Sequence, residues 1–235
     1  MTSRSGPAAA AETHDGGTYD DERYDATPFL PRRGGLPAYR RAAADCRGCP
    51  LHRDASGTVF GRGPAHARLM LVGEQPGDRE DQEGRAFVGP AGRLLSRALR
   101  DAGIDEDDVY LTNAVKHFKF TEEETRKRRI HKAPSLRETL ACRPWLLAEL
   151  RLVSPELIVT LGATAGRSLL GPSFRVGTDR GVPQALPEVG GEAVDAAGGV
   201  RVLPTVHPSA VLRSRDREEM YAGLVADLRA AAEAL

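Results

Sequence analysis

The sequence has few cysteines, no long apolar run and no net charge, and each deficit excludes a class of protein. It holds three cysteines in 235 residues, an odd count that argues against a framework of disulfide bonds. No run approaches the roughly 18 apolar residues of a membrane span, and the N-terminus lacks the apolar core of a secretion signal. Lys plus Arg equals Asp plus Glu at 33 each. The sequence therefore predicts a soluble, cytoplasmic protein without membrane contact, and its net charge indicates no particular partner.

The first residues differ in composition from the rest of the chain. Residues 1–35 are rich in Ala, Gly, Asp, Thr and Arg and show no apolar periodicity, so they cannot repay the entropy lost on ordering. We predict a disordered N-terminal tail over 1–35 and one domain over 36–235. A domain of that length can enclose a hydrophobic core by itself, and we expect a monomer.

Four continuous apolar runs alternate with helical patterns, and the runs predict strands near 69–72, 109–115, 157–161 and 200–206. The predicted helices cover 90–102, the stretch from a capping box at 135–138 to about 152, a short segment from 162 to about 171, and a terminal helix from Ser209 to 234. This alternation predicts an α/β fold with three layers, α/β/α, around a four-stranded parallel sheet. Ligands of such sheets bind outside the carboxyl ends of the strands.

Four motifs lie at these strand ends in chain order: Gly73-Glu74-Gln75-Pro76-Gly77, Gly84-Arg85-Ala86-Phe87-Val88-Gly89-Pro90-Ala91-Gly92, Thr112-Asn113-Ala114-Val115-Lys116 and His207-Pro208-Ser209. Each motif alone is weakly specific. Together, and with the cysteine pattern, they resemble the uracil-DNA glycosylase superfamily from about Pro37 to the C-terminus.

Two departures from the iron-sulfur family 4 enzymes make the chain most similar to the UdgX group. Family 4 has a Lys-Cys-Arg-Pro type sequence after the asparagine strand, where this chain has Lys116-His117-Phe118-Lys119. Family 4 also lacks an insertion like Lys127-Arg128-Arg129-Ile130-His131, which resembles the signature loop of UdgX. The resemblance implies an enzyme that excises uracil from DNA and becomes covalently linked to the abasic site through a loop histidine.

The resemblance also implies a pocket that reads an extruded uracil. Phe87 is expected to stack on the ring, and the Asn113 amide to pair with N3–H and O4, which cytosine does not match. Backbone N–H groups from Gly73 to Gln75 are expected to hold the base, with Gln75 shaping the pocket floor. The plainer alternatives are that Phe87 is a core residue and Asn113 a turn residue.

Cleavage of the N-glycosidic bond leaves positive charge on the sugar and negative charge on uracil, so the site needs an anion and a hydrogen-bond donor. By resemblance Glu74 and His207 fill these roles, His131 captures the sugar as nucleophile, and Arg129 anchors the loop or a phosphate. The open alternatives are a surface His131 in a solvated basic loop, and a turnover family 4 enzyme that uses water.

The remaining motif concerns a metal, because a Cys-x-x-Cys pair in a cytosolic chain suggests metal or redox chemistry. A [4Fe-4S] cluster needs four ligands, and the family positions map onto Cys46, Cys49, His117 and Cys142. The alternatives are a surface His117 with an exogenous fourth ligand, and zinc, which suits a Cys3His set. In each case the expected role is structural.

Basic residues gather in two segments, Arg126 to Lys132, and Arg213, Arg215 and Arg217. Each alone is more often a solvated surface. Combined with the resemblance they are expected to contact the backbone of uracil-containing DNA, including single strands, with salt-sensitive affinity. Such a protein would associate with the nucleoid in a prokaryote. The alternatives from other classes are a nucleic-acid-binding module that kept the fold without the chemistry, and a redox protein using Cys46 and Cys49.

Overall fold

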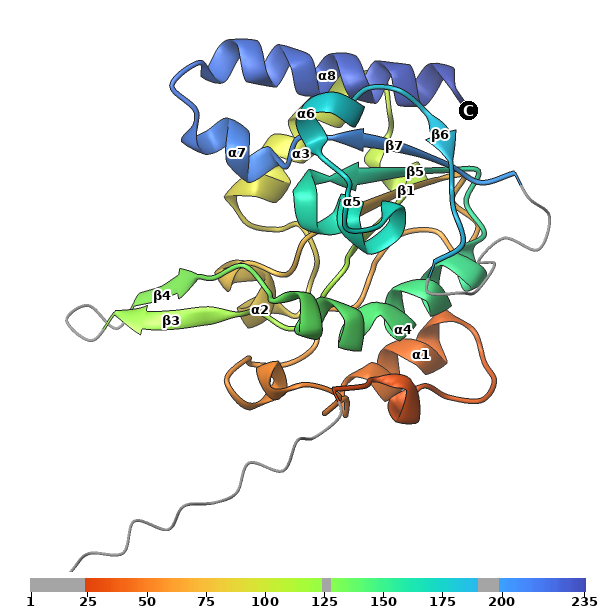
Figure 1. Cartoon of the computed structure of the whole chain (residues 1–235), viewed down its shortest axis with the longest axis vertical. Coiled ribbons are helices and arrows are strands. Elements are labelled where there is room, and N and C mark those ends of the chain that lie inside the picture. The colour runs from red at the N-terminus through yellow and green to blue at the C-terminus, as the bar shows by residue number, and fades with distance from the viewer. Residues whose placement is uncertain (1–23, 124–127, 190–198) are drawn as a thin grey trace, which may run out of the picture.

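The centre of the fold is a five-stranded sheet between two layers of helices (Figure 1). The computed structural model describes residues 24–123, 128–189 and 199–235. The strand order is β2-β1-β5-β7-β6, and the first four strands are parallel. Their bounds are β1 (Leu69–Gly73), β2 (Val109–Asn113), β5 (Leu157–Leu161), β6 (Gln184–Ala185) and β7 (Arg201–Thr205). The predicted α/β/α class is confirmed.

The sheet has one strand more than the sequence predicted. β6 is two exposed residues long and pairs antiparallel with β7 at the edge of the sheet. The prediction of four parallel strands is correct for the parallel part and wrong for the whole sheet, because a short exposed edge strand leaves no apolar run to detect.

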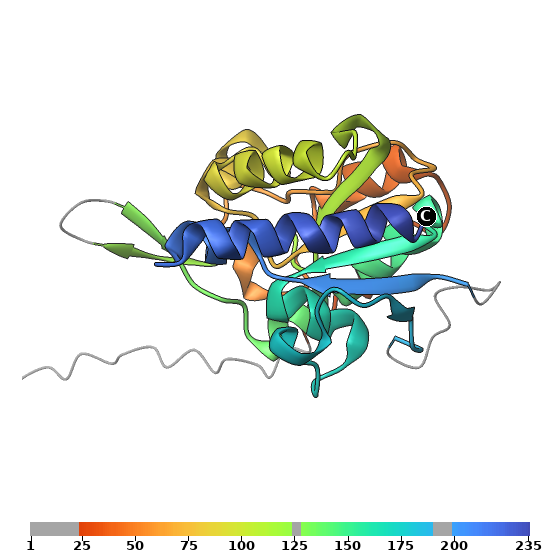
Figure 2. The same cartoon turned by 90° about the horizontal axis from the view of Figure 1, so that it is seen from above.

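The central strands are buried on both faces, which explains their continuous apolar runs. Along β1, Met70 and Val72 face a core covered by α1 (Leu36–Ala43), α4 (Leu136–Val153) and α5 (Gly162–Leu170). Leu69 and Leu71 face the opposite core, covered by α3 (Pro90–Asp101), α7 (Pro208–Arg213) and α8 (Arg217–Glu233). Figure 2 shows α3 in yellow and α5 in teal on opposite sides of the sheet.

The helix ends follow local sequence signals with one exception. α4 begins with the predicted capping box, in which Glu138 N donates to Ser135 Oγ (3.2 Å) and Ser135 N donates to Glu138 Oε2 (2.6 Å). The predicted C-terminal helix from Ser209 is instead two helices, α7 and α8, and the N-cap of α7 is His207. Pro208 occupies the first helical position, where its missing N–H costs nothing, so the cap is the residue before it.

The segment around His131, which the sequence predicted as a loop, is a β-hairpin. β3 (Phe120–Glu123) pairs antiparallel with β4 (Arg128–His131), which places Phe120 opposite His131. The hairpin projects from the body beyond the carboxyl ends of the parallel strands (Figures 1 and 2). Arg126 and Lys127 of the predicted basic segment lie outside the described residues.

The folded part begins before residue 36. Of the predicted tail, residues 1–23 lie outside the described residues, whereas residues 24–35 are described and their first part lies against α4. Ala26 is buried and its N–H donates to Ala141 O (3.0 Å), and Arg137 covers the ring of Tyr24.

The other helices are short connections between these elements: η1 (Thr27–Phe29), η2 (Pro50–Arg53), α2 (Asp78–Glu83), η3 (Glu106–Asp108) and α6 (Val176–Asp179). Within the described ranges, no helix combines the length and the apolar character that crossing a membrane requires.

Candidate active site

Three residues of the expected uracil pocket, Gly73, Phe87 and Asn113, meet at the carboxyl ends of β1 and β2. Gly73 pairs with Asn113 in the strand register, and the ring of Phe87 lies against the same spot. A Cβ on Gly73 would lie 2.8 Å from Phe87 Cζ and closer still to the Asn113 amide oxygen. Phe87 and Asn113 are both buried. Glycine at position 73 therefore lets an aromatic ring and an amide, the two groups expected to read uracil, face one small space.

The Phe87 ring is held by an unusual backbone. Its φ is +56°, in the left-handed region that side-chain-bearing residues rarely adopt. Gly92 makes this possible from the next helix, because a Cβ there would collide with the Phe87 carbonyl group. Strain of this kind persists only where the surroundings impose it, and it is often found at functional sites.

The carboxylate of Glu74 lies between a histidine and a hydroxyl. Oε1 is 3.4 Å from Nε2 of His131, and Oε2 accepts a hydrogen bond from Thr164 Oγ1. Glu74 is 23% exposed and His131 is 49% exposed, so a large substrate can reach both. Sequence reasoning missed Thr164, although it lies just after Gly162-Ala163 at the end of β5, where the fold predicts ligand contacts.

His207 is placed by the start of α7. Its Nδ1 accepts a hydrogen bond from Ser209 N (3.1 Å) and lies 2.7 Å from Ser209 Oγ. Burial, and then electrostatic interaction with His131 and Arg213, lower the pKa of His207 to about 4. The ring is therefore neutral at pH 7, and because Nδ1 accepts from a backbone N–H, its proton lies on Nε2. Nε2–H is thus the group that can donate to a ligand.

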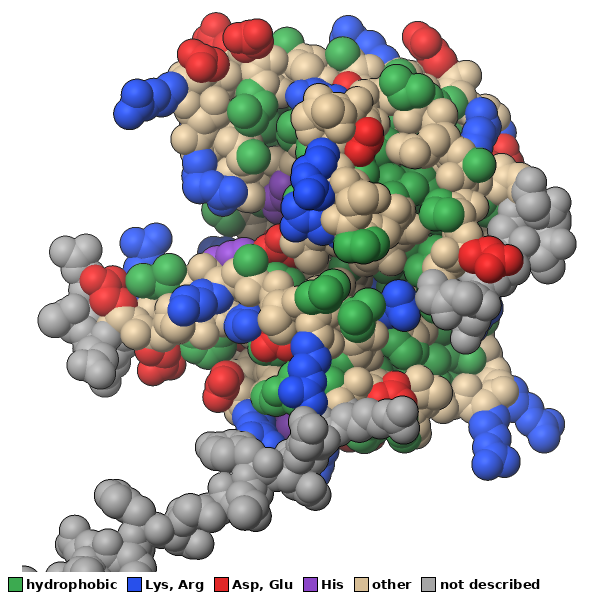
Figure 3. Space-filling model, in the orientation of Figure 1, with side chains coloured by type: hydrophobic (Ala, Val, Ile, Leu, Met, Phe, Trp, Pro, Cys, Tyr) green, Lys and Arg blue, Asp and Glu red, His purple; other side chains and the backbone are tan. Residues whose placement is uncertain are grey.

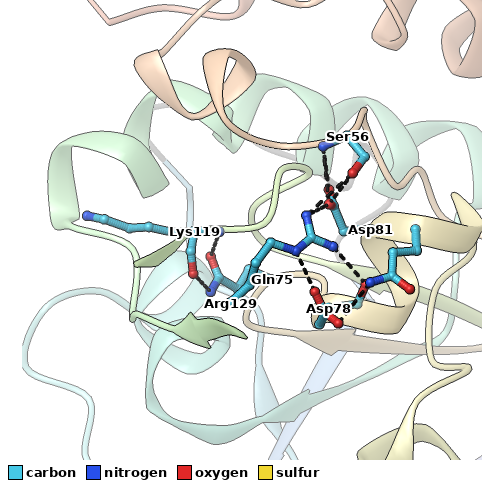
Figure 4. Close-up of polar contacts among 7 residues, drawn as sticks. Ser56, Gln75, Asp78, Asp81, Lys119 and Arg129 are labelled. Atoms are coloured by element: carbon cyan, nitrogen blue, oxygen red, sulfur yellow. Dashed lines mark hydrogen bonds and ion pairs between the residues drawn. The ribbon is translucent and has the colours of Figure 1, made fainter. Parts of the chain in front are cut away.

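The hairpin that carries His131 is fixed at its base by Gln75 (Figure 4). Gln75 Nε2 donates to Lys132 O (2.8 Å) and Lys119 O (3.2 Å), and Gln75 Oε1 accepts from Lys119 N (3.0 Å). The sequence suggested that Gln75 shapes the pocket floor, and this stays a prediction. The structure gives its amide a further contact, because it joins both ends of the hairpin to the end of β1.

Arg129 fixes the hairpin a second time. Its guanidinium donates to Asp78 Oδ1 and to Asp81 Oδ2, both at 2.6 Å (Figure 4). It also lies over the ring of Phe120. Asp81 is buried and also accepts from the backbone N–H of Ser56. Of the two roles proposed for Arg129, anchoring the loop or a phosphate, this geometry supports the anchor.

A notch opens between the hairpin and α7 (Figure 3). Histidine side chains lie at its inner end, and Lys and Arg side chains lie on both its sides. The hairpin and α7, which flank the notch, carry described residues of the two basic segments, Arg128 and Arg129 on β4 and Arg213 on α7. Such a distribution suits a backbone of phosphates that passes across the catalytic groups.

The three cysteines belong to two parts of the chain: Cys142 lies on α4, and Cys46 and Cys49 lie between α1 and η2. All three are buried free thiols, and each interacts electrostatically with the others. Trp145 Nε1 donates to Cys46 Sγ (3.2 Å) and Lys116 N donates to Cys142 Sγ (3.3 Å). Burial raises the pKa of Cys49 to about 11 and that of Cys142 to about 12. Grouped thiols with N–H donors aimed at sulfur fit the ligand set of an iron-sulfur cluster.

His117 belongs to the same region. It is buried, so the alternative of a surface histidine is wrong. Burial, and then the nearby His52, lower the pKa of His117 to about 4, which leaves the neutral ring that metals bind. His52, whose Nδ1 lies 2.7 Å from Cys49 O, was not a sequence candidate. Within the residues that the structure describes, no three His, Cys, Asp or Glu side chains converge as they would around a single metal ion.

The fold is an α/β sheet, and the residues expected to form the pocket meet at the carboxyl edge of its parallel strands. The family model of the uracil DNA glycosylase superfamily matches residues 60–229, which include Glu74, Phe87, Asn113, His131 and His207. The chain therefore belongs to the uracil-DNA glycosylase superfamily.

Curated relatives lie within the same superfamily. The chain is 40% identical over 173 residues to the type-4 uracil-DNA glycosylase of Thermotoga maritima, covering 74% of this chain and 81% of that protein. It is 34% identical to the type-4 enzyme of Pyrobaculum aerophilum, over 72% of this chain and 80% of the relative. A type-5 uracil-DNA glycosylase of Mycobacterium tuberculosis is 33% identical over 64% of this chain and 57% of its own length.

Proposed function

We propose that the protein excises uracil from DNA, single strands included, and then captures the resulting sugar covalently through His131. The observation that carries the capture is the position of the His131 imidazole, 3.4 Å from the Glu74 carboxylate at the mouth of the pocket. Membership of the superfamily and the likeness to type-4 enzymes support the excision. Gln75 and Arg129 support the capture because they hold the hairpin in place before any substrate binds.

Base reading uses the first part of the site. A uracil flipped into the pocket stacks on Phe87, and the Asn113 amide accepts from N3–H and donates to O4. Cytosine presents the opposite donor and acceptor pattern there, so it leaves a buried amide unpaired and is rejected. Gly73 leaves room for the base to approach the β1 backbone.

The bond between C1′ and N1 then breaks, and its electron pair leaves with uracil. The Nε2–H of His207 donates to O2 and stabilises that negative charge, while Glu74 stabilises the positive charge on the sugar. A lone pair on the His131 ring forms the new bond to C1′, and the other ring nitrogen loses its proton through Glu74. That proton balances the one that the uracil anion takes up, so the products are free uracil and a neutral protein-DNA adduct.

The metal-binding region has a supporting role in this proposal. A [4Fe-4S] cluster bound by Cys46, Cys49, Cys142 and His117 would join the N-terminal segment, α4 and the end of β2. The observations in favour are the grouped buried thiols and the neutral buried imidazole. When bound, the cluster supplies a rigid covalent link between segments, and the uracil chemistry needs no electron from it.

A second candidate is hydrolysis with turnover, in which water replaces His131 as the nucleophile. The likeness to type-4 enzymes favours it, since the site of this chain is built on the same superfamily pattern. The two candidates share the pocket, Glu74 and His207, and they differ only in what attacks C1′.

One experiment separates them. The purified protein is incubated with a single-stranded oligonucleotide carrying one uracil, and with the same strand carrying thymine, and the products are run on a denaturing gel. Wild type should give a heat-stable, slower band with uracil only, and His131→Ser should abolish it. His66→Ser is the matched control because His66 is exposed and precedes the amino end of β1, whereas the pocket lies at the carboxyl end.

The outcomes lead to different conclusions. Alkali-sensitive strands without a shifted band in wild type would remove His131 as nucleophile and leave the uracil pocket in place. Unreacted uracil strands, with neither an adduct nor free uracil, would refute the whole proposal. They would also favour a binding module that kept the fold.

A further inference from the structure

A groove of about 470 Å³ lies beside the active site, between α4 and α5. One wall is a single face of α4, formed by Leu136, Leu140 and Arg143, whose spacing of four and three residues puts them in one row. The other wall carries Thr164, Arg167 and Ser168 of α5. The volume is in the range of sites that hold a small organic group such as a nucleotide.

The groove starts at the catalytic groups. Thr164, which lines it, donates to Glu74, and Pro134, which lines its opening, follows His131 by three residues. From Leu136 the α4 wall runs two helical turns, about 10 Å, to Arg143. When the deoxyuridine of a DNA strand occupies the pocket, the neighbouring nucleotides of that strand can therefore run along this groove.

The charges of the groove suit an anion. It is lined by Arg143, Arg167 and Arg175, against one acid, Glu188. Arg175 donates to three backbone carbonyl groups of its own loop, from Pro172 to Phe174. The guanidinium groups of Arg143 and Arg167, by contrast, make no hydrogen bond or ion pair with any residue in the described ranges, so their donors remain for a ligand.

Apolar side chains complete the groove. Leu136 is 65% and Leu140 is 43% exposed, which is high for leucines within a folded domain. Figure 3 shows hydrophobic side chains (green) and basic ones (blue) together over α4, α5 and α6. Apolar walls with two free guanidinium groups match the two parts of a nucleotide, a flat base and a phosphate.

We propose that this groove is a second nucleotide site, which binds the DNA residue or residues on one side of the target uracil. Leu136 and Leu140 contact the neighbouring base, and Arg143 and Arg167 bind phosphates. The proposal rests on the proposed function, because a strand can enter this groove and the pocket together only if uracil-containing DNA is the substrate. The two basic segments at the notch do not line this groove.

The test is single-turnover reaction of uracil strands with wild type, Arg143→Gln, Arg167→Gln and the double variant. Arg100→Gln is the control: it removes the same charge from an exposed position on α3, on the opposite face of the sheet. Three strands are compared, one with the uracil in the middle and two that end directly 5′ or directly 3′ of it. Each reaction gives a maximal rate and a half-saturating DNA concentration, measured over a series of salt concentrations.

The groove variants should raise the half-saturating concentration of the full strand several-fold and leave its maximal rate unchanged. The slope of log affinity against log salt should fall by about 0.7 for each phosphate that the variant no longer binds. One of the two truncated strands should bind wild type as weakly as the full strand binds the double variant, and this strand should show no further loss of affinity with the variants. Leu140→Glu, which adds a negative charge at an exposed position, should give the same pattern without disturbing the core.

Two results would overturn the proposal. If the groove variants match Arg100→Gln on every strand, the groove binds no DNA, and the uracil chemistry stands unaffected. If they lower the maximal rate equally on full and truncated strands, the arginines act on the reacting centre and not on a neighbouring nucleotide. Absence of uracil release by wild type, in contrast, would refute the proposed function itself.

Discussion

The buried pair Lys116 and Glu149 offers the sharpest test of how this site is supported. Lys116 is 1% and Glu149 0% exposed, and they form an ion pair behind the pocket. Lys116 Nζ also donates to Asn113 O and Thr112 Oγ1, both at 2.7 Å. The Glu149 carboxylate further accepts from Tyr110 OH, Thr112 Oγ1 and Gly61 N. The pair therefore holds the backbone of the residue expected to read uracil.

Lys116→Met removes the charge and keeps most of the volume. It leaves a buried carboxylate without its cation, and breaking a buried pair in this way costs about 3–5 kcal/mol. For a chain of this size, 1 kcal/mol corresponds to roughly 2–4 °C, so the thermal midpoint should fall by about 6–20 °C. The double variant Lys116→Met/Glu149→Gln removes both charges and should recover a large part of the loss.

Urea denaturation of wild type, both single variants and the double variant gives the coupling energy directly, because the residues are in contact. Uracil release should fall in Lys116→Met at temperatures where the fold is intact, since Asn113 O loses its donor. The reasoning is refuted if Lys116→Met costs less than about 1 kcal/mol, the value of an exposed pair. It is also refuted if the double variant is no more stable than the worse single variant.

Three further changes test other parts of the site. Gln75→Ala removes the bonds that close the hairpin, so the adduct should form up to about 100-fold more slowly, as for a group misplaced by roughly 1 Å; the gel assay measures this. Gly73→Ala puts a methyl group between Phe87 and Asn113 and should lower uracil release by about 100-fold or more, measured by chromatography of the free base. The pKa of His207 is about 4 against an ordinary 6.5, so the unfolded chain binds more protons between these values, and stability should fall by up to about 3 kcal/mol as the pH falls from 6.5 to 4. In His207→Gln the free energy of unfolding, measured by denaturation, should change less between pH 6.5 and 4. If it changes as much as in wild type, His207 is not the cause of the pH dependence.

The parallel sheet was predictable from the sequence, because buried strands such as 157–161 are continuous apolar runs. The capping box at Ser135 was equally plain. The split of the terminal helix was missed, although Pro208 was a local signal that the helix begins there and that His207 is its cap.

The hairpin was not predictable in the same way. Half of the residues in its two strands are Glu or Arg, and Ile130 is 46% exposed, so neither strand has a continuous apolar run. What holds the hairpin is Arg129 with Asp78 and Asp81, together with the Gln75 amide, which are contacts across 44 to 57 positions of the chain. Hydrophobic periodicity depends on residues that are close in the sequence, so it does not predict contacts between residues that are far apart in the chain.

The hairpin also explains how one pocket can support two reactions. Phe87, Asn113, Glu74 and His207 are positioned by the sheet and the helices that follow its strands, and they serve base release in either case. His131 is half exposed, and the hairpin that carries it holds its ring beside Glu74. If the hairpin is loosened, water gains access to the same face of the sugar while the leaving group keeps its support. Gln75→Ala should therefore shift the products from adduct toward free abasic DNA at a nearly unchanged rate of uracil release. An equal loss of both products would show instead that the hairpin helps to build the uracil pocket.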